Sequence, residues 1–134
     1  MRKVIISFIF ILLAFAVKAQ NTGLATYYGK KFNNRKTASG ERYRKDSMVC
    51  AHKTYPFSTM LRVKSLVNGN EVIVRVIDRG PFRKKCIIDL SYAAAKELDM
   101  LHQGLIKVEI SEYNNKENIN RSDSLNVTKI TRAK

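Results

Sequence analysis

The chain has 134 residues, with 25 Lys and Arg against 11 Asp and Glu, which gives a net charge of +14. A chain of this length supports the core of one small domain rather than two. The positive charge suits a polyanionic partner, but no Lys/Arg run is interleaved with a recognition helix or stacking aromatics, so nucleic acid is not expected. Charge alone raises encounter rates with anionic polymers or head groups and assigns no activity.

The first 19 residues have the pattern of a signal peptide. Arg2 and Lys3 precede an apolar run over residues 4–17, and small residues occupy positions 17 and 19. The run of about 14 residues is shorter than the ~20 needed to span a bilayer, which argues against a membrane anchor. Cleavage removes three cations and no acids, so the net charge falls to +11. With no Cys near the cleavage point, we expect a protein that is exported, periplasmic or secreted, without a lipid anchor or transmembrane segment.

Short strands dominate the first half of the mature part. Residues 23–29 are β-prone and bounded by glycines, which predicts a strand, whereas residues 30–48 are polar without a sustained period and predict a loop. Residues 60–66 and 71–77 alternate apolar and polar side chains on either side of Asn68-Gly69. Because this dipeptide tolerates the positive φ angles of a tight turn, the pattern predicts a β-hairpin.

The second half adds two strands and a helix. Pro81 ends the hairpin because it offers no N–H to a strand ladder. Residues 87–90 predict a short buried strand, and Ser91 is a natural N-cap for a helix over residues 92–98. Residues 107–111 alternate again and should close the sheet.

These elements divide the chain into a signal peptide (1–19), a domain (20–112) and a basic, polar tail (113–134) that we expect to be disordered. Many short strands with one or two short helices predict a mainly β fold closed into a small barrel, because open edges would invite association. The pattern does not give the strand order. We expect a monomer.

Cys50 and Cys86 are the two cysteines of the chain. In an exported protein a single bridge between them is the simplest interpretation, and two buried, unpaired thiols are the alternative. Such a bridge would stabilise the fold by roughly 4 kcal/mol in the chain-entropy model. With only His52 and His102 to join them, the spacing argues against zinc, and no metal or cofactor is expected.

Six motifs in order carry a resemblance to a known family. They are Gly23-Leu-Ala-Thr-Tyr-Tyr-Gly29, Thr37-Ala-Ser-Gly-Glu41, Ala51-His-Lys-Thr-Tyr-Pro56, Asn68-Gly69, Val74-Arg-Val-Ile-Asp-Arg-Gly-Pro-Phe82 and Ile88-Asp-Leu-Ser91. Together they resemble the signatures of the rare lipoprotein A (RlpA) family over about residues 23–111. The resemblance implies a six-stranded double-psi β-barrel related to expansins, and in one branch a lytic transglycosylase that acts on peptidoglycan glycan strands.

The resemblance also assigns roles to three residues. The family's catalytic Asp falls on Asp78, its acidic partner on Glu41 and its His on His52. A carboxylic acid protonates the leaving oxygen of a glycosidic bond, and a second carboxylate commonly assists. In a lytic transglycosylase the conjugate base then deprotonates the C6 hydroxyl of the sugar, which leaves a 1,6-anhydro-N-acetylmuramic acid end. We assign Asp78 to this acid/base role, Glu41 to charge stabilisation or sugar orientation, and His52 to hydrogen bonding.

Two further residues each have two possible roles. Tyr28 either stacks on a sugar ring or belongs to the core, and Arg79 either holds a substrate carboxylate or braces its loop. Tyr28, Thr37 and Arg79 are the expected substrate-binding residues. Without the resemblance, Asp78 would be read as a turn former and Glu41 as a solvated loop acid. Asp89 and His102 are interpreted as structural, so neither is given a catalytic role.

The sequence departs from the family pattern in three respects: it lacks a lipid-bearing Cys, it has Tyr27 where Trp is common, and the stretch after Ser111 is too short for a peptidoglycan-binding repeat domain. The expected function is a lytic transglycosylase that cleaves the MurNAc–GlcNAc bond in cell-wall remodelling. The alternatives are a non-catalytic, expansin-like module that binds wall glycan and an interaction protein on the same scaffold. Glu41 and Asp78 together favour the enzyme, because a binder gains little from two acids facing a polyanionic wall.

Overall fold

The computed structural model describes residues 21–116 and residue 119. The elements in chain order are β1 (Asn21–Tyr27), the 3-10 helix η1 (Lys30–Phe32), β2 (Val49–His52), β3 (Met60–Ser65), β4 (Glu71–Asp78), β5 (Cys86–Leu90), α2 (Tyr92–Glu97) and β6 (Ile106–Glu112). The predicted signal peptide, and the tail beyond the few residues described after β6, lie outside this range. Within it, no helix has the length and apolar character needed to cross a membrane.

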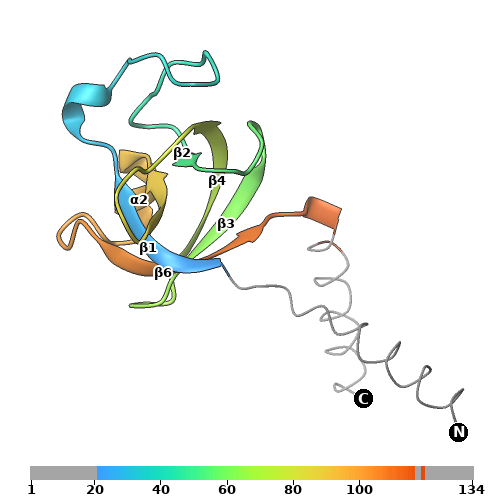
Figure 1. Cartoon of the computed structure of the whole chain (residues 1–134). Coiled ribbons are helices and arrows are strands. Elements are labelled where there is room, and N and C mark those ends of the chain that lie inside the picture. Colours follow the sequence, from blue (N-terminus) through green and yellow to red (C-terminus); the bar gives the residue numbers. More distant parts are fainter. Residues whose placement is uncertain (1–20, 117–118, 120–134) are drawn as a thin grey trace, which may run out of the picture.

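The six strands form a closed barrel in the order β1-β5-β2-β4-β3-β6 (Figure 1). The pairs β1–β5 and β2–β4 are parallel, and the other neighbouring pairs are antiparallel. Because strands distant in the sequence interleave, the loop after β1 and the loop after β4 are brought to the same region. The predicted closed, mainly β barrel is confirmed, and its closure leaves no unpaired edge.

The hairpin and the helix also form as predicted. β3 and β4 pair antiparallel around a turn in which Gly69 has a φ of +78°. The side-chain oxygen of Ser91 accepts a hydrogen bond from the backbone N–H of Ala94, as an N-cap does. Ala94 and Ala95 are buried where α2 packs against β1 and β4.

The barrel interior is filled by alternate side chains of the strands. Val72, Val74 and Val76 of β4 point inward with Ile88 and Leu90 of β5, and all are almost fully buried. The residues between them face outward, which is the period of two expected of a half-buried strand. An outward-facing polar residue on these strands is therefore available to a site on the barrel surface.

A second, smaller hydrophobic cluster lies under the long loop between β1 and β2. It consists of the buried Tyr43, Val49 and Ile77, with Tyr28 and Phe32 packed against it. Figure 1 shows this loop (cyan) extending over one end of the barrel. The loop was predicted as irregular, yet its aromatic side chains fix it to the barrel.

The predicted bridge between Cys50 and Cys86 is not formed, and both residues are buried, unpaired thiols. Cys50 on β2 pairs with Leu90 at the end of β5, whereas Cys86 begins β5. Four residues of strand separate Leu90 from Cys86, about 13 Å at the usual rise per residue. A disulfide needs Cα atoms within about 7 Å of each other, so the strand register corrects the prediction.

We predict that neither thiol reacts in the native protein. Burial, followed by the charge of Asp89, raises the pKa of the Cys50 thiol to about 12, so little thiolate forms at neutral pH. A thiol reagent added at pH 8 should find no reactive group before denaturation and both cysteines after it. If the denatured, unreduced protein reveals no thiols, the two residues are bridged and the strand register described above is wrong.

Candidate active site

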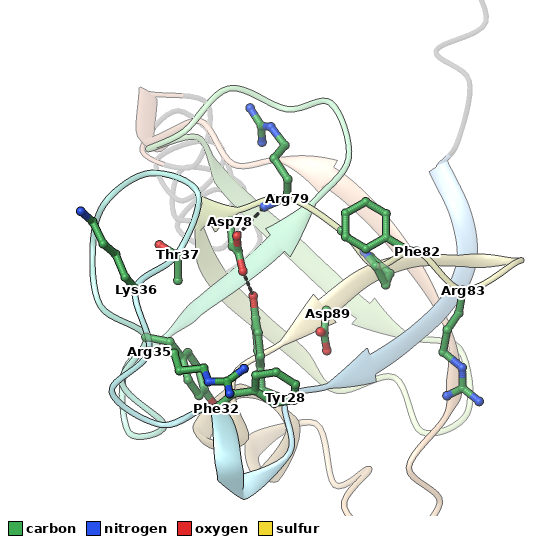
Figure 2. Close-up of a pocket in the computed structure, with 13 residues that line it drawn as sticks. Tyr28, Phe32, Arg35, Lys36, Thr37, Asp78, Arg79, Phe82, Arg83 and Asp89 are labelled. Atoms are coloured by element: carbon green, nitrogen blue, oxygen red, sulfur yellow. Dashed lines mark hydrogen bonds between the residues drawn. The ribbon is translucent and has the colours of Figure 1, made fainter.

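A cavity of about 380 Å³ opens where the loops after β1 and β4 meet (Figure 2). Two acids, Asp78 at the end of β4 and Asp89 on β5, lie in it. The complete lining is Tyr28, Phe32, Arg35, Lys36, Thr37, Tyr43, Asp78, Arg79, Gly80, Pro81, Phe82, Arg83 and Asp89. Of the residues predicted for the site, the structure brings together Tyr28, Thr37, Asp78 and Arg79.

The Asp78 carboxylate accepts hydrogen bonds from three donors. The Tyr28 hydroxyl donates to Oδ2 at 2.6 Å, and the backbone N–H groups of Ala38 and Arg79 both donate to Oδ1 at 2.9 Å. Hydrogen bonds donated to a carboxylate stabilise its negative charge and fix its orientation. The three donors therefore fix the orientation of the Asp78 carboxyl group in the cavity.

Tyr28 combines a packed ring with a polar tip. Its ring stacks on that of Tyr43, with centroids 4.3 Å apart, and the ring of Phe32 meets it edge-on at 6.0 Å. Burial, followed by the hydrogen bond and charge of Asp78, raises the pKa of Tyr28 well above its ordinary value of 10.0. The hydroxyl therefore remains protonated and serves as a donor, and the ring belongs to the core cluster under the loop.

Asp89, interpreted from the sequence as structural, lies in the cavity and is therefore a further functional candidate. It faces outward from β5 beside Thr26 of β1, whose hydroxyl donates to Asp89 Oδ1 at 3.0 Å. Burial raises the pKa of Asp89 to about 6; the hydrogen bond from Thr26 opposes this increase, and the charge of Asp78 makes a smaller contribution that raises the pKa further. The sequence does contain an indication of this, because Asp89 is the single charged residue of the otherwise apolar strand β5.

The Glu41 carboxylate does not line the cavity. It forms a two-pronged ion pair with Arg75, whose Nη1 and Nη2 lie 2.7 Å from the two carboxylate oxygens, and these hydrogen bonds lower the pKa of Glu41. Thr37 closes the same loop by donating its hydroxyl and its N–H to the Glu41 carbonyl oxygen. The ion pair therefore ties this loop to β4. The same loop carries the Ala38 N–H group that donates to Asp78. Glu41, expected from the sequence to be the acidic partner of Asp78, is thus not among the residues that line the cavity with it.

His52 and Arg79 hold the turn that follows β2. The buried imidazole of His52 accepts hydrogen bonds at Nδ1 from the N–H groups of Thr54 and Tyr55, both at 3.1 Å. Burial, then the charges of Arg79 and Lys53, lowers the pKa of His52 and keeps the ring neutral. The structure places the imidazole outside the cavity lining, in a position that supports the turn.

Arg79 is one of the residues that line the cavity, and its side chain contacts the turn after β2. Its guanidinium donates to the carbonyl oxygens of His52 at 3.2 Å and Tyr55 at 2.9 Å, and it lies 4.0 Å from the ring centroid of Phe57. Figure 2 shows this side chain directed away from Asp78. Of the two interpretations left open, the geometry supports bracing. Among the described residues, no group of three or more His, Cys, Asp or Glu could hold a metal ion.

A family model described as lytic transglycolase matches residues 20–110, most of the described barrel. The chain belongs to the lytic transglycolase family. The resemblance to RlpA proteins noted from the motifs is confirmed by relatives within this family.

Two relatives illustrate the similarity. The probable endolytic peptidoglycan transglycosylase RlpA of Aquifex aeolicus is 52% identical over 87 residues, which cover 65% of this chain and 38% of that protein. The endolytic peptidoglycan transglycosylase RlpA of Haemophilus influenzae is 45% identical over 112 residues, 84% of this chain and 39% of that protein. The lytic transglycolase domain described here thus spans about two fifths of the length of these relatives.

Solved structures show the same fold. A Streptomyces papain inhibitor matches with a TM-score of 0.53 and 26% identity, over 71% of this chain and 96% of that one. The apo expansin of Clavibacter michiganensis matches with a TM-score of 0.56 and 23% identity, over 72% of this chain and 51% of that one. At this identity the expansin similarity concerns the barrel alone.

We predict that Asp89→Asn stabilises this lytic transglycolase domain at neutral pH. Because the pKa of Asp89 is raised from 3.8 to about 6 in the folded state, folding binds a proton, and stability is lost as the pH rises from 4 through 6. Asn retains the acceptor for Thr26 and carries no charge. The free energy of unfolding should rise by about 2 kcal/mol at pH 7.5 and remain unchanged at pH 3.5. Urea unfolding at both pH values measures this, and a loss of stability at pH 7.5 would contradict the burial described.

Proposed function

We propose that this domain cleaves the glycan strands of peptidoglycan as a lytic transglycosylase, at the bond between N-acetylmuramic acid and N-acetylglucosamine. The observation that carries the proposal is the pair of acids in one cavity, whose carboxyl groups have different surroundings. The Asp78 carboxyl group accepts hydrogen bonds from three donors, whereas burial raises the pKa of Asp89 to about 6. A pair of this kind provides a proton donor and a stabilising charge. The names of the relatives agree with this chemistry.

Asp89 is the proton donor in this mechanism. Its carboxylic acid protonates the glycosidic oxygen as the bond from that oxygen to the anomeric carbon breaks. The resulting Asp89 carboxylate then accepts the proton of the C6 hydroxyl, whose oxygen forms the new bond to the anomeric carbon. The acid is thereby regenerated, no water is consumed, and the product ends in a 1,6-anhydro sugar.

Asp78 stabilises the positive charge that develops on the sugar ring. From the sequence, Asp78 was expected to take the acid/base role; because both of its carboxyl oxygens accept hydrogen bonds, from three donors in all, we give it the stabilising role instead. Tyr28 fixes its orientation from one side and the loop N–H of Ala38 from the other. Glu41 acts through the loop that it ties to Arg75, and His52 supports the neighbouring turn.

We also propose where the reaction takes place. The domain acts on the glycan strands of the cell wall after export, in the periplasm or outside the cell. We further propose that the domain works as a monomer without cofactor. The alternative is a barrel that binds wall glycan without cleaving it.

Digestion of purified sacculi, followed by mass spectrometry, tests the activity. The unmodified domain should release anhydro-muropeptides, and Asp89→Asn and Asp78→Asn should each abolish them while both proteins still sediment with sacculi. Reducing ends among the products would mean hydrolysis. Sedimentation without any product from the unmodified domain would instead support the binding module.

The rate of cleavage should follow the protonation of Asp89. Because the donor must carry a proton, kcat/KM should fall as the pH rises above about 6. Initial rates of anhydro-product formation between pH 4.5 and 8 measure this. A rate that keeps increasing up to pH 8 would rule out Asp89 as the donor.

Glu41 and Arg75 should behave as a unit. If Glu41 acts by tying the loop to β4, Glu41→Gln and Arg75→Gln each weaken the hold on Asp78 and lower kcat by a similar factor, about tenfold. The double variant should then be no worse than either single one. A much larger effect of Glu41→Gln than of Arg75→Gln would show that the Glu41 carboxylate contacts the sugar directly.

A further inference from the structure

The side chain of Phe82 is 91% exposed although it lines the cavity that holds the two acids. Among the large hydrophobic residues recorded as exposed in the described part of the chain, the next is Val67, at 63%, in the turn between β3 and β4. Single exposed aliphatic residues are common on protein surfaces. An aromatic ring left almost wholly in water at the wall of a cavity offers a large apolar face to whatever enters.

Phe82 differs in this from the other aromatic residues of the cavity. Tyr28 and Tyr43 stack on each other, and the ring of Phe32 meets Tyr28 edge-on with the cations of Lys31 and Arg35 at 5.2 and 5.3 Å from its centroid. These three rings belong to the packing under the loop. Among the described residues that line the cavity, Phe82 is the aromatic whose ring is covered by no such partner.

The backbone also determines where the Phe82 ring lies. Gly80 has a φ of +130°, and a Cβ atom there would lie 3.6 Å from Cε2 of Phe82, so the ring rests beside the bare backbone of Gly80. Figure 2 shows the ring on the side of the cavity opposite Thr37 and Lys36, with Asp78 and Asp89 between the two sides. A chain bound over both acids would therefore continue across the Phe82 ring.

We propose that Phe82 forms a carbohydrate subsite next to the acids, in which the apolar C–H face of one sugar of the glycan stacks on the ring. The inference rests on the proposed function for the identity of the substrate. The face of a pyranose ring carries C–H groups that can pack on an aromatic ring. The cations around the cavity would suit the hydroxyl groups and anionic substituents of the sugar. The stacking contact thereby determines which sugar lies next to the glycosidic bond that Asp89 protonates.

Substitution of Phe82 tests this in the active domain. Phe82→Leu keeps an apolar side chain but removes the flat face, and should raise KM for soluble glycan strands about tenfold with little change in kcat, because the contact is made equally before and in the transition state. Phe82→Trp should retain the parent KM. Val67→Ala is the matched control, an exposed apolar residue outside the cavity lining, and should change neither constant. An unchanged KM in Phe82→Leu, or the same increase in Phe82→Trp, overturns the proposal.

A binding experiment separates failure of the subsite from failure of the proposed reaction. Soluble glycan strands are titrated into Asp89→Asn and into Asp89→Asn combined with Phe82→Leu, and affinity is measured by calorimetry. About tenfold weaker binding by the double variant supports the subsite even if the unmodified domain forms no anhydro product. Equal affinities, or no binding by Asp89→Asn, overturn the subsite, whereas the proposed reaction is judged independently by product formation.

Discussion

The hydrogen bonds to the Asp78 carboxylate join the end of β4 to two segments that lie 40 and 50 residues away in the sequence. Tyr28 follows β1, Ala38 belongs to the long loop, and Arg79 follows Asp78 itself at the end of β4. These groups meet because the strands of the barrel interleave, with β5 and β2 separating β1 from β4. Charge-assisted hydrogen bonds of this kind are about twice as strong as neutral ones, so the held carboxylate both organises the loop and defines the cavity.

The fixed charge has consequences for its neighbour. Asp89 lies in the same cavity, and the negative charge of Asp78 adds to the effect of burial in raising its pKa. Two carboxyl groups of one residue type thus have different surroundings in one cavity, an arrangement that enzymes use to divide acid and charge-stabilising roles between two acids. The cost of burying Asp89 is consistent with an active site, where stability is commonly given up for chemistry.

Local features of the fold were accessible from the sequence because they depend on neighbouring residues. The hairpin at Asn68-Gly69 and the N-cap at Ser91 follow from turn and helix-end chemistry. β2 escaped prediction because it has four consecutive buried residues and no alternation. The strand order and the separation of Cys50 from Cys86 depend on non-local pairing, which no local pattern records.

The same distinction applies to the site. Asp78 was recognised because its motif is contiguous, whereas the proposed role of Asp89 depends on its burial and on the cavity that it shares with Asp78. Glu41 and His52 were assigned to catalysis by resemblance, and their contacts became visible only in three dimensions: Arg75 binds Glu41, and the turn after β2 binds His52. A sequence motif identifies which residues matter more readily than it identifies what each one contacts.

The central claim is that burial, with a smaller contribution from the charge of Asp78, raises the pKa of the Asp89 carboxyl group to about 6. Carbon-13 NMR of the aspartate carboxyl groups, titrated from pH 3 to 8 in the unmodified domain and in Asp78→Asn, tests it most directly. The account predicts that the Asp89 carboxyl carbon titrates near pH 6 and that its midpoint moves to lower pH when Asp78 loses its charge. Titration of Asp89 near its ordinary value of 3.8, with no response to Asp78→Asn, would contradict it.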